Sequence, residues 1–211
     1  MHKKEFITAG QGVDTASKVL IMIHGRGGSA EDILGLSDHL HVKDFAILAP
    51  KATGNTWYPY SFLMPPSQNE PWLSSALQVI KEVVHDVVEK GVTEERIYFL
   101  GFSQGACLTL EFVTRNATRY GGVVAFTGGL IGDKIYEQNY TGDFDGTPIF
   151  IGTSDPDPHV PVQRVHDSEL ILQKLNASVT VKVYKGMGHT INQDEIAAAN
   201  NIISPVPKVH S

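Results

Sequence analysis

Short apolar runs alternate along the chain with longer stretches of helical periodicity. Several runs are continuously apolar, which is typical of strands that are covered on both faces. Strands are predicted at residues 19–23, 45–48, 97–100, 123–126, 149–151 and 179–184. Helices are predicted at residues 75–90, 106–115, 162–175 and 192–203, the last with a capping-box pattern formed by Asn192 and Glu195. This alternation predicts an α/β fold with a mostly parallel central sheet and helices on both faces.

Two connections between these elements are long. Residues 51–74 show no strand or helix periodicity and carry large apolar side chains at Trp57, Tyr58, Tyr60, Phe62, Met64 and Trp72. Such a loop either packs on its own aromatic residues or forms an apolar lip over a ligand site. We favour the lip, because loops on an α/β scaffold usually form the site. The second connection, residues 128–147, is too short for a cap of several helices. We therefore expect one domain over residues 1–211, with an open cleft and a frayed tail at 204–211.

The charge and cysteine content narrow the classes of function. The chain has 17 Lys and Arg against 23 Asp and Glu, a net charge of −6, so it lacks the basic surplus of a nucleic-acid binder. Its single cysteine, Cys107, excludes an internal disulfide and is expected to pack in the core. No signal-peptide pattern is present, and no run approaches about 20 apolar residues. We expect a cytoplasmic protein that binds no nucleic acid and does not insert stably into a membrane.

The candidate chemistry begins at the turn that follows the strand at 97–100. Gly101-Phe102-Ser103-Gln104-Gly105 has the pattern G-x-S-x-G between a predicted strand and a predicted helix. In that setting a sharp turn strains the serine backbone and exposes its hydroxyl, and side chains at the flanking glycines would collide with neighbouring backbone. A structural glycine-rich turn is the alternative, but the strand–turn–helix context favours a nucleophilic serine.

A serine hydroxyl needs a base that is itself oriented by a third group. The strand at 149–151 runs into a loop with Asp155 and Asp157, and the strand at 179–184 runs into a loop with His189. These side chains follow strand ends at the same edge of the sheet as Ser103. The chain order of serine, acid and histidine therefore predicts a catalytic triad.

Four motifs carry a resemblance to a known family: GFSQG at 101–105, HGRGG at 24–28, SDPDPHVP at 154–161 and GMGH at 186–189. Together they resemble the phospholipase/carboxylesterase family of α/β-hydrolases, which includes carboxylesterases, lysophospholipases and acyl-protein thioesterases. The resemblance implies a serine hydrolase that cleaves carboxylic esters or thioesters through an acyl-enzyme, with no cofactor. The lack of a cap favours short to medium acyl chains. A lysophospholipase or an acyl-protein thioesterase is the alternative substrate class.

The resemblance also implies roles for individual residues. The family's D-P-x-V-P stretch falls on residues 157–161, which makes Asp157 the expected acid, although Asp155 stays open as a second candidate. The family's H-G-x-G pattern implies that the N–H of Arg26 is one oxyanion-hole donor. The N–H of Gln104, directly after the nucleophile, is expected to be the other.

The substrate pocket is expected to be lined by residues from two loops. Trp57 and Tyr58 in the long loop and Leu130 after the strand at 123–126 are expected to line it. The side chain of Arg26 is expected to be a solvated or salt-bridged surface group, although it could also steer an acid-bearing substrate. We expect His159, beside Asp157, to serve local packing, although it could also reach the site.

Other classes of function are disfavoured. Residues 25–30 match a dinucleotide-binding G-x-G-x-x-G/A pattern, but the next strand is followed by Lys51 and not by the acidic residue that would hold a ribose. A catalytically inert relative that binds ligands is disfavoured because no member of the triad is missing. His39 and His41 do not have enough partners for a metal site. The expected partner is a small-molecule or lipid-like ester, and the sequence leaves a monomer and a homodimer open.

Overall fold

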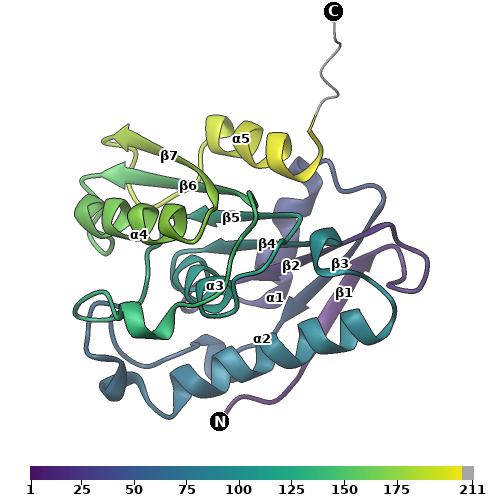
Figure 1. Ribbon diagram of the computed structural model, residues 1–211, viewed down its shortest axis with the longest axis horizontal. Helices are drawn as coiled ribbons and strands as arrows, with labels where there is room; N and C mark the ends of the chain where they lie inside the picture. The colour runs from purple at the N-terminus through teal and green to yellow at the C-terminus, as the bar shows by residue number, and fades with distance from the viewer. Residues whose placement is uncertain (206–211) are drawn as a thin grey trace, which may run out of the picture.

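The apolar runs form the neighbouring parallel strands of a seven-stranded sheet in the computed structural model, which describes residues 1–205 (Figure 1). The strand order is β1-β3-β2-β4-β5-β6-β7, and only β1 is antiparallel to its neighbour. The strands are β1 (Phe6–Gly10), β2 (Lys18–Ile23), β3 (Phe45–Pro50), β4 (Ile97–Phe102), β5 (Gly122–Phe126), β6 (Pro148–Asp155) and β7 (Ser178–Lys185). All six predicted strands are present. The predicted α/β fold is confirmed.

Helices cover both faces of the sheet, which explains why its central strands are continuously apolar. The helices are α1 (Ala30–Leu34), α2 (Trp72–Glu89), α3 (Gln104–Arg115), α4 (Val162–Lys174) and α5 (Gln193–Ile203). In β2, Val19, Ile21 and Ile23 pack in one core with residues of α2, α3 and α4. The alternate residues Leu20 and Met22 pack in a second core with residues of α1 and α5. Since side chains alternate across a strand, each buried strand supplies both cores.

The strand β1 was not predicted. It pairs with β3 across a register of Phe6 with Pro50 and Gly10 with Ala46, and its residues alternate between exposed and half-buried. It is an edge strand with a short apolar pattern, so its pairing depends on a partner about forty residues away rather than on a local signal. The short helix α1 was also missed. Ser29 and Asp32 form a capping box at its start.

All four predicted helices are present. Helix α4 begins at the predicted residue, and the other three begin one to three residues away from the prediction. Helix α2 begins at Trp72, where Glu70 accepts a hydrogen bond from the N–H of Ser74 (3.1 Å), and it ends before Gly91, whose φ of +90° stops it. The capping box of Asn192 and Glu195 at the start of α5 is confirmed. Of the tail expected to be frayed, residues 206–211 lie outside the described range. Among residues 1–205, no helix is long and apolar enough to cross a bilayer.

The connection from β5 to β6 contains one short 3₁₀ turn (Glu137–Asn139) and, within the described chain, no cap domain. Glu111 of α3 holds this segment against the body of the protein. Its fully buried carboxylate accepts hydrogen bonds from the N–H of Ile131 (3.0 Å) and the hydroxyl of Tyr140 (2.9 Å), and it pairs with Arg115 (2.8 Å). Because a buried carboxylate needs such partners, Glu111 ties the segment down instead of leaving it to form a lid.

A second buried carboxylate, Glu195, makes the stability of the fold depend on pH. Burial raises the pKa of Glu195 to about 7, although a hydrogen bond from the N–H of Asn192 lowers it, and its Oε1 atom has no hydrogen-bond partner among residues 1–205. Between pH 4.5 and 7 the native state therefore binds a proton that the unfolded state has released, so unfolding free energy falls as pH rises. Glu195→Gln removes this titration. As pH rises from 4.5 to 7, the unfolding free energy of this variant should increase by about 2–3 kcal/mol relative to that of the wild type.

Urea unfolding at several pH values measures this difference. Glu89→Gln, at an exposed position of α2, is the matched control and should follow the wild type. A constant difference between Glu195→Gln and the wild type across the interval would contradict the prediction.

Candidate active site

The nucleophile candidate Ser103 lies at the turn between β4 and α3. Its φ of 54° and ψ of −118° place it in a strained conformation, as G-x-S-x-G predicts. A Cβ atom on Gly101 would lie 2.4 Å from the carbonyl oxygen of Gly105, and one on Gly105 would lie 2.1 Å from that of Ile23. Only glycine fits at both positions, so the two glycines let the turn close tightly against β2.

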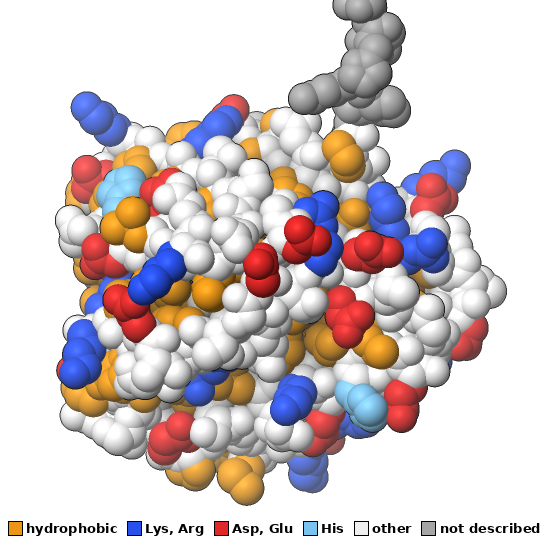
Figure 2. All heavy atoms as spheres, in the orientation of Figure 1, with side chains coloured by type: hydrophobic (Ala, Val, Ile, Leu, Met, Phe, Trp, Pro, Cys, Tyr) orange, Lys and Arg blue, Asp and Glu red, His pale blue; other side chains and the backbone are white. Residues whose placement is uncertain are grey.

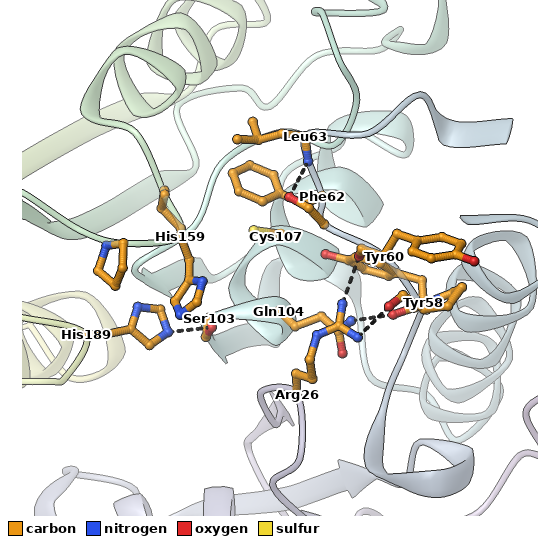
Figure 3. A pocket seen from close by; sticks show the side chains of 14 residues that line it. Arg26, Tyr58, Tyr60, Phe62, Leu63, Ser103, Gln104, Cys107, His159 and His189 are labelled. Atoms are coloured by element: carbon orange, nitrogen blue, oxygen red, sulfur yellow. Dashed lines mark hydrogen bonds between the residues drawn. The ribbon is translucent and has the colours of Figure 1, made fainter. Parts of the chain in front are cut away.

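His189 lies within hydrogen-bonding distance of both a hydroxyl and a carboxylate. Its Nε2 atom is 2.7 Å from Oγ of Ser103, and its Nδ1 atom is 2.9 Å from Oδ2 of Asp157. If Nδ1 carries the hydrogen that the carboxylate accepts, Nε2 has its lone pair free toward the serine hydroxyl. The three side chains come from loops after β4, β6 and β7, far apart in the sequence and joined at one edge of the sheet. Figure 3 shows the contact between His189 and Ser103.

The structure distinguishes the two candidate acids. Asp155 is the last residue of β6 and is exposed, whereas the Asp157 side chain is fully buried against His189. The other oxygen of Asp157 accepts hydrogen bonds from the N–H groups of His159 and Val160, both at 2.8 Å. Burial alone would raise the pKa of Asp157, but the hydrogen bonds from His189 and these two N–H groups lower it below its ordinary value. Asp157 is therefore held ionised beside the imidazole.

The loop that carries His189 is held by a backbone hydrogen bond and by ring contacts. The N–H of Gly188 donates a hydrogen bond to the buried Ser154 hydroxyl (2.9 Å). The ring of His189 packs between those of Phe102 and His159, with centroid distances of 5.3 Å and 5.0 Å. These contacts hold the imidazole in the orientation in which it meets both Ser103 and Asp157.

Two backbone N–H groups are available near the serine for an oxyanion. Gln104 is the first residue of α3, so its N–H has no acceptor within the helix. The turn at residues 24–28 lies alongside, because a Cβ on Gly25 would be 3.5 Å from Cβ of Ser103. Within residues 1–205 the N–H of Arg26, the next residue, donates to no other group, whereas the N–H of Gly27 donates to Asn55 (2.7 Å).

The Gln104 side chain joins the nucleophile turn to the long loop before α2. Its carbonyl oxygen accepts a hydrogen bond from the N–H of Trp57 (2.9 Å), and its amide donates to the carbonyl of Tyr58 (2.8 Å). Trp57 itself is fully buried and donates its indole N–H to the carbonyl of His24 (2.9 Å). The prediction that Trp57 lines the pocket is therefore wrong, because its ring anchors the loop to the interior.

Two buried histidines hold the beginning of the same loop. The Nδ1 atom of His2 accepts a hydrogen bond from the N–H of Thr53 (3.0 Å), and its Nε2 donates to the carbonyl of Trp57 (2.8 Å). The Nε2 atom of His24 accepts one from the N–H of Ala52 (3.2 Å). Burial lowers the pKa of both imidazoles. Both must stay neutral to accept these bonds, so the loop is best held at neutral or higher pH.

The side chains around Ser103 enclose a cavity of about 740 Å³ (Figure 3). Residues 58–63 form one wall, which confirms that the long loop borders the site, with Tyr58 among its lining residues as predicted. Leu130 does not line this cavity. It is fully buried, and its backbone binds the side chains of Ser168 and Arg164, so that prediction is wrong.

Three further residues line the cavity. His159 is exposed, lines the cavity and lies against His189, so the alternative that it reaches the site is confirmed over a role in packing alone. Phe62 and Leu63 line the cavity as part of the long loop that was expected to form its wall. Cys107 forms part of the cavity wall but is buried, and burial raises the pKa of its thiol to about 12. It is therefore a packing residue, as predicted.

The remaining side-chain expectations concern Arg26 and metal binding. The guanidinium of Arg26 forms no ion pair with a described carboxylate and instead donates hydrogen bonds to the carbonyls of Pro59 (2.9 Å) and Tyr60 (2.8 Å). Among the described residues the expected salt bridge is not found, whereas the expected surface position is confirmed, since Arg26 is exposed. No cluster of three potential metal ligands occurs among residues 1–205.

Comparison with known proteins relates the chain to carboxylesterases and acyl-protein thioesterases. The family model for Phospholipase/Carboxylesterase matches residues 3–206. Acyl-protein thioesterase 1 of Kluyveromyces lactis is 27% identical over 217 residues, which span 92% of this chain and 94% of that protein. A phospholipase/carboxylesterase structure from Dyadobacter fermentans is 55% identical, with a TM-score of 0.94 over 96% of this chain and 97% of its own. The Bacillus cereus carboxylesterase structure, 18% identical with a TM-score of 0.76 over 93% and 92% of the two chains, supports the fold alone.

The two buried histidines predict an acid-sensitive loop. Below pH 6.5 the unfolded chain gains protons on His2 and His24 that the native state resists, so unfolding free energy falls as pH drops from 6.5. His2→Asn keeps an acceptor for the N–H of Thr53 but does not titrate. This variant should lose less stability than the wild type between pH 7.5 and 5.5, measured by urea unfolding.

His85→Asn, at an exposed position of α2, is the control and should lose as much stability as the wild type. An equal loss in His2→Asn and the wild type would show that His2 does not titrate against folding.

Proposed function

Because the chain belongs to the phospholipase/carboxylesterase family and is an esterase-type hydrolase, we propose that it cleaves esters or thioesters with Ser103, His189 and Asp157 as its catalytic triad. One observation carries the assignment of residues. The hydroxyl, the imidazole and the buried carboxylate form one line of hydrogen bonds of 2.7 Å and 2.9 Å. Ser103 and His189, two members of this line, are lining residues of the cavity.

In the first half of the reaction, Oγ of Ser103 attacks the acyl carbon while Nε2 of His189 takes the hydroxyl proton. Asp157 keeps the hydrogen on Nδ1 and stabilises the imidazolium that forms. The lowered pKa of Asp157 supports this role, since the carboxylate stays ionised throughout. The strained backbone at Ser103 keeps the hydroxyl clear of the sheet.

The acyl oxygen gains negative charge as the tetrahedral intermediate forms. The N–H groups of Arg26 and Gln104 are its proposed donors. One preorganised donor of this kind contributes about 3–4 kcal/mol to stabilising the transition state. The N–H of Gln104 also lies at the start of α3, where the positive end of the helix dipole favours an anion.

In the second half, His189 gives its proton to the leaving alcohol or thiol, and the acyl group stays on Ser103. Water then enters, His189 removes its proton, and the same steps release the acid and restore the serine. The proposed residues need no metal or cofactor for these steps.

The family acts on small ester substrates. For this chain we propose short to medium acyl chains, because residues 58–63 close one side of a cavity of about 740 Å³. A thioesterase activity is the second candidate, favoured by the match to a protein named acyl-protein thioesterase 1 along 92% of this chain. The continuous sheet supports the proposal of a single domain.

A cytoplasmic location and the lack of nucleic-acid binding also stay proposals. The lack of nucleic-acid binding is supported by the net charge of −6 and by the positive and negative side chains that are interspersed on the face seen in Figure 2.

Replacing the nucleophile tests the proposal directly. Ser103→Ala should abolish covalent capture by a fluorophosphonate probe, because among residues 1–205 no other hydroxyl is paired with His189. The circular dichroism spectrum should stay that of the wild type. Ser61→Ala, at another serine of the same cavity, should still be labelled. Labelling of Ser103→Ala at a different residue would contradict the assigned nucleophile.

The acid is tested by a matched pair of variants. Asp157→Asn should lower kcat by about 10⁴-fold, because an amide in place of the carboxylate favours the wrong imidazole tautomer and cannot stabilise the imidazolium. Asp155→Asn should change kcat by less than about threefold, since the exposed carboxylate does not contact His189. The opposite ranking in steady-state assays with p-nitrophenyl acetate would reverse the assignment.

A further inference from the structure

The catalytic cavity has a positive lining in a protein of negative net charge. Its ionisable lining residues include Arg26, His159 and His189, and none of its lining residues is an aspartate or glutamate. The chain as a whole has a net charge of −6. Asp157 is close by, but its side chain is fully buried and hydrogen-bonded to His189. A cavity of this kind favours substrates that carry negative charge.

Arg26 is the fixed cation of this lining. Its two terminal nitrogens donate to the carbonyls of Pro59 and Tyr60, and its guanidinium carbon lies 5.9 Å from the centre of the Tyr58 ring. Carbonyls orient the guanidinium but do not neutralise it, and no described carboxylate lies within 4.0 Å of it. Of its five N–H groups, three remain for another acceptor. The group is thus held in place with an uncompensated charge.

The position of Arg26 relative to Ser103 indicates which part of a substrate it meets. Figure 3 shows Arg26 and His189 on opposite sides of Ser103. The leaving oxygen must lie at Nε2 of His189, which protonates it, so the leaving group extends toward His189 and His159. The acyl oxygen faces the N–H groups of Arg26 and Gln104. The acyl chain is assigned to the remaining wall of the cavity, away from His189, which residues 58–63 and the side chain of Arg26 form.

We propose that the side chain of Arg26 binds a carboxylate at the far end of the acyl group. The preferred substrates are then half-esters or half-thioesters of short dicarboxylic acids. A guanidinium suits this role because its N–H groups bind a carboxylate in pairs and it stays charged at all physiological pH values. This inference rests on the proposed ester hydrolysis by Ser103 and specifies its substrate class.

Matched ester pairs test the inference. The mono-p-nitrophenyl esters of succinic, glutaric and adipic acid are compared with p-nitrophenyl butyrate, pentanoate and hexanoate, so that each pair differs mainly in a terminal carboxylate or methyl group. At low ionic strength kcat/KM should be at least about 10-fold higher for the charged ester in one or more pairs, and 0.5 M NaCl should reduce this ratio. If the neutral ester reacts as fast as the charged ester in all three pairs, the inference is overturned, but the proposed hydrolysis of esters by Ser103 is not. No turnover of any ester would overturn both.

Variants assign the preference to the side chain. The ratio of kcat/KM within a pair cancels any loss that Arg26 substitutions cause in the oxyanion hole or the loop. Arg26→Gln should bring the ratio to about 1, and Arg26→Lys should keep part of it because the charge remains. His159→Gln should keep the ratio of the wild type. A ratio that persists in Arg26→Gln, or that disappears in His159→Gln, would show that Arg26 is not the group that selects the carboxylate.

Discussion

The site depends on the close approach of three backbone segments at the nucleophile turn. Strand β4, strand β2 and the first turn of α3 meet where Gly101 and Gly105 have no side chains, and any Cβ atom would overlap a carbonyl of a neighbouring segment. This approach forces Ser103 into its positive-φ conformation and starts α3 directly after it. The position of the Ser103 hydroxyl, and the N–H of Gln104 that has no acceptor among residues 1–205, both follow from the same packing. The proposed nucleophile and one proposed oxyanion donor are therefore placed together.

The loop before α2 is coupled to this turn by polar contacts to its backbone. Gln104 binds the N–H of Trp57 and the carbonyl of Tyr58, and Arg26 binds the next two carbonyls along the chain. A long loop without regular structure has many backbone groups that need partners. Here two side chains from the oxyanion turns supply them. The wall of the cavity is therefore positioned by the same residues whose N–H groups are the proposed oxyanion donors.

Much of the site was predictable because parallel strands end at one edge. Ser103, Asp157 and His189 each follow a predicted strand, so the period of apolar residues alone brings them near one another, and G-x-S-x-G identifies the turn. Motif similarity, not periodicity, favoured Asp157 over Asp155, and only the side-chain contact with His189 separates them.

The side-chain directions within irregular segments could not be predicted. Trp57 and Tyr58 are neighbouring aromatic residues, yet only Tyr58 lines the cavity, whereas Trp57 lies in the core. The role of Arg26 depends on backbone carbonyls, which every residue has, so no sequence pattern marks its partners. β1 was missed for a related reason, since its partner β3 lies far along the chain.

The electrostatics of the triad bear on the substrate as well as on the chemistry. Asp157 needs its negative charge to orient His189, but a carboxylate open to the cavity would repel an anionic substrate. Its side chain is fully buried against His189, and three hydrogen bonds lower its pKa although burial alone would raise it. The charge that the cavity presents is then that of Arg26, which only neutral carbonyls hold. A site that needs an acid for catalysis can thus remain attractive to an acidic substrate.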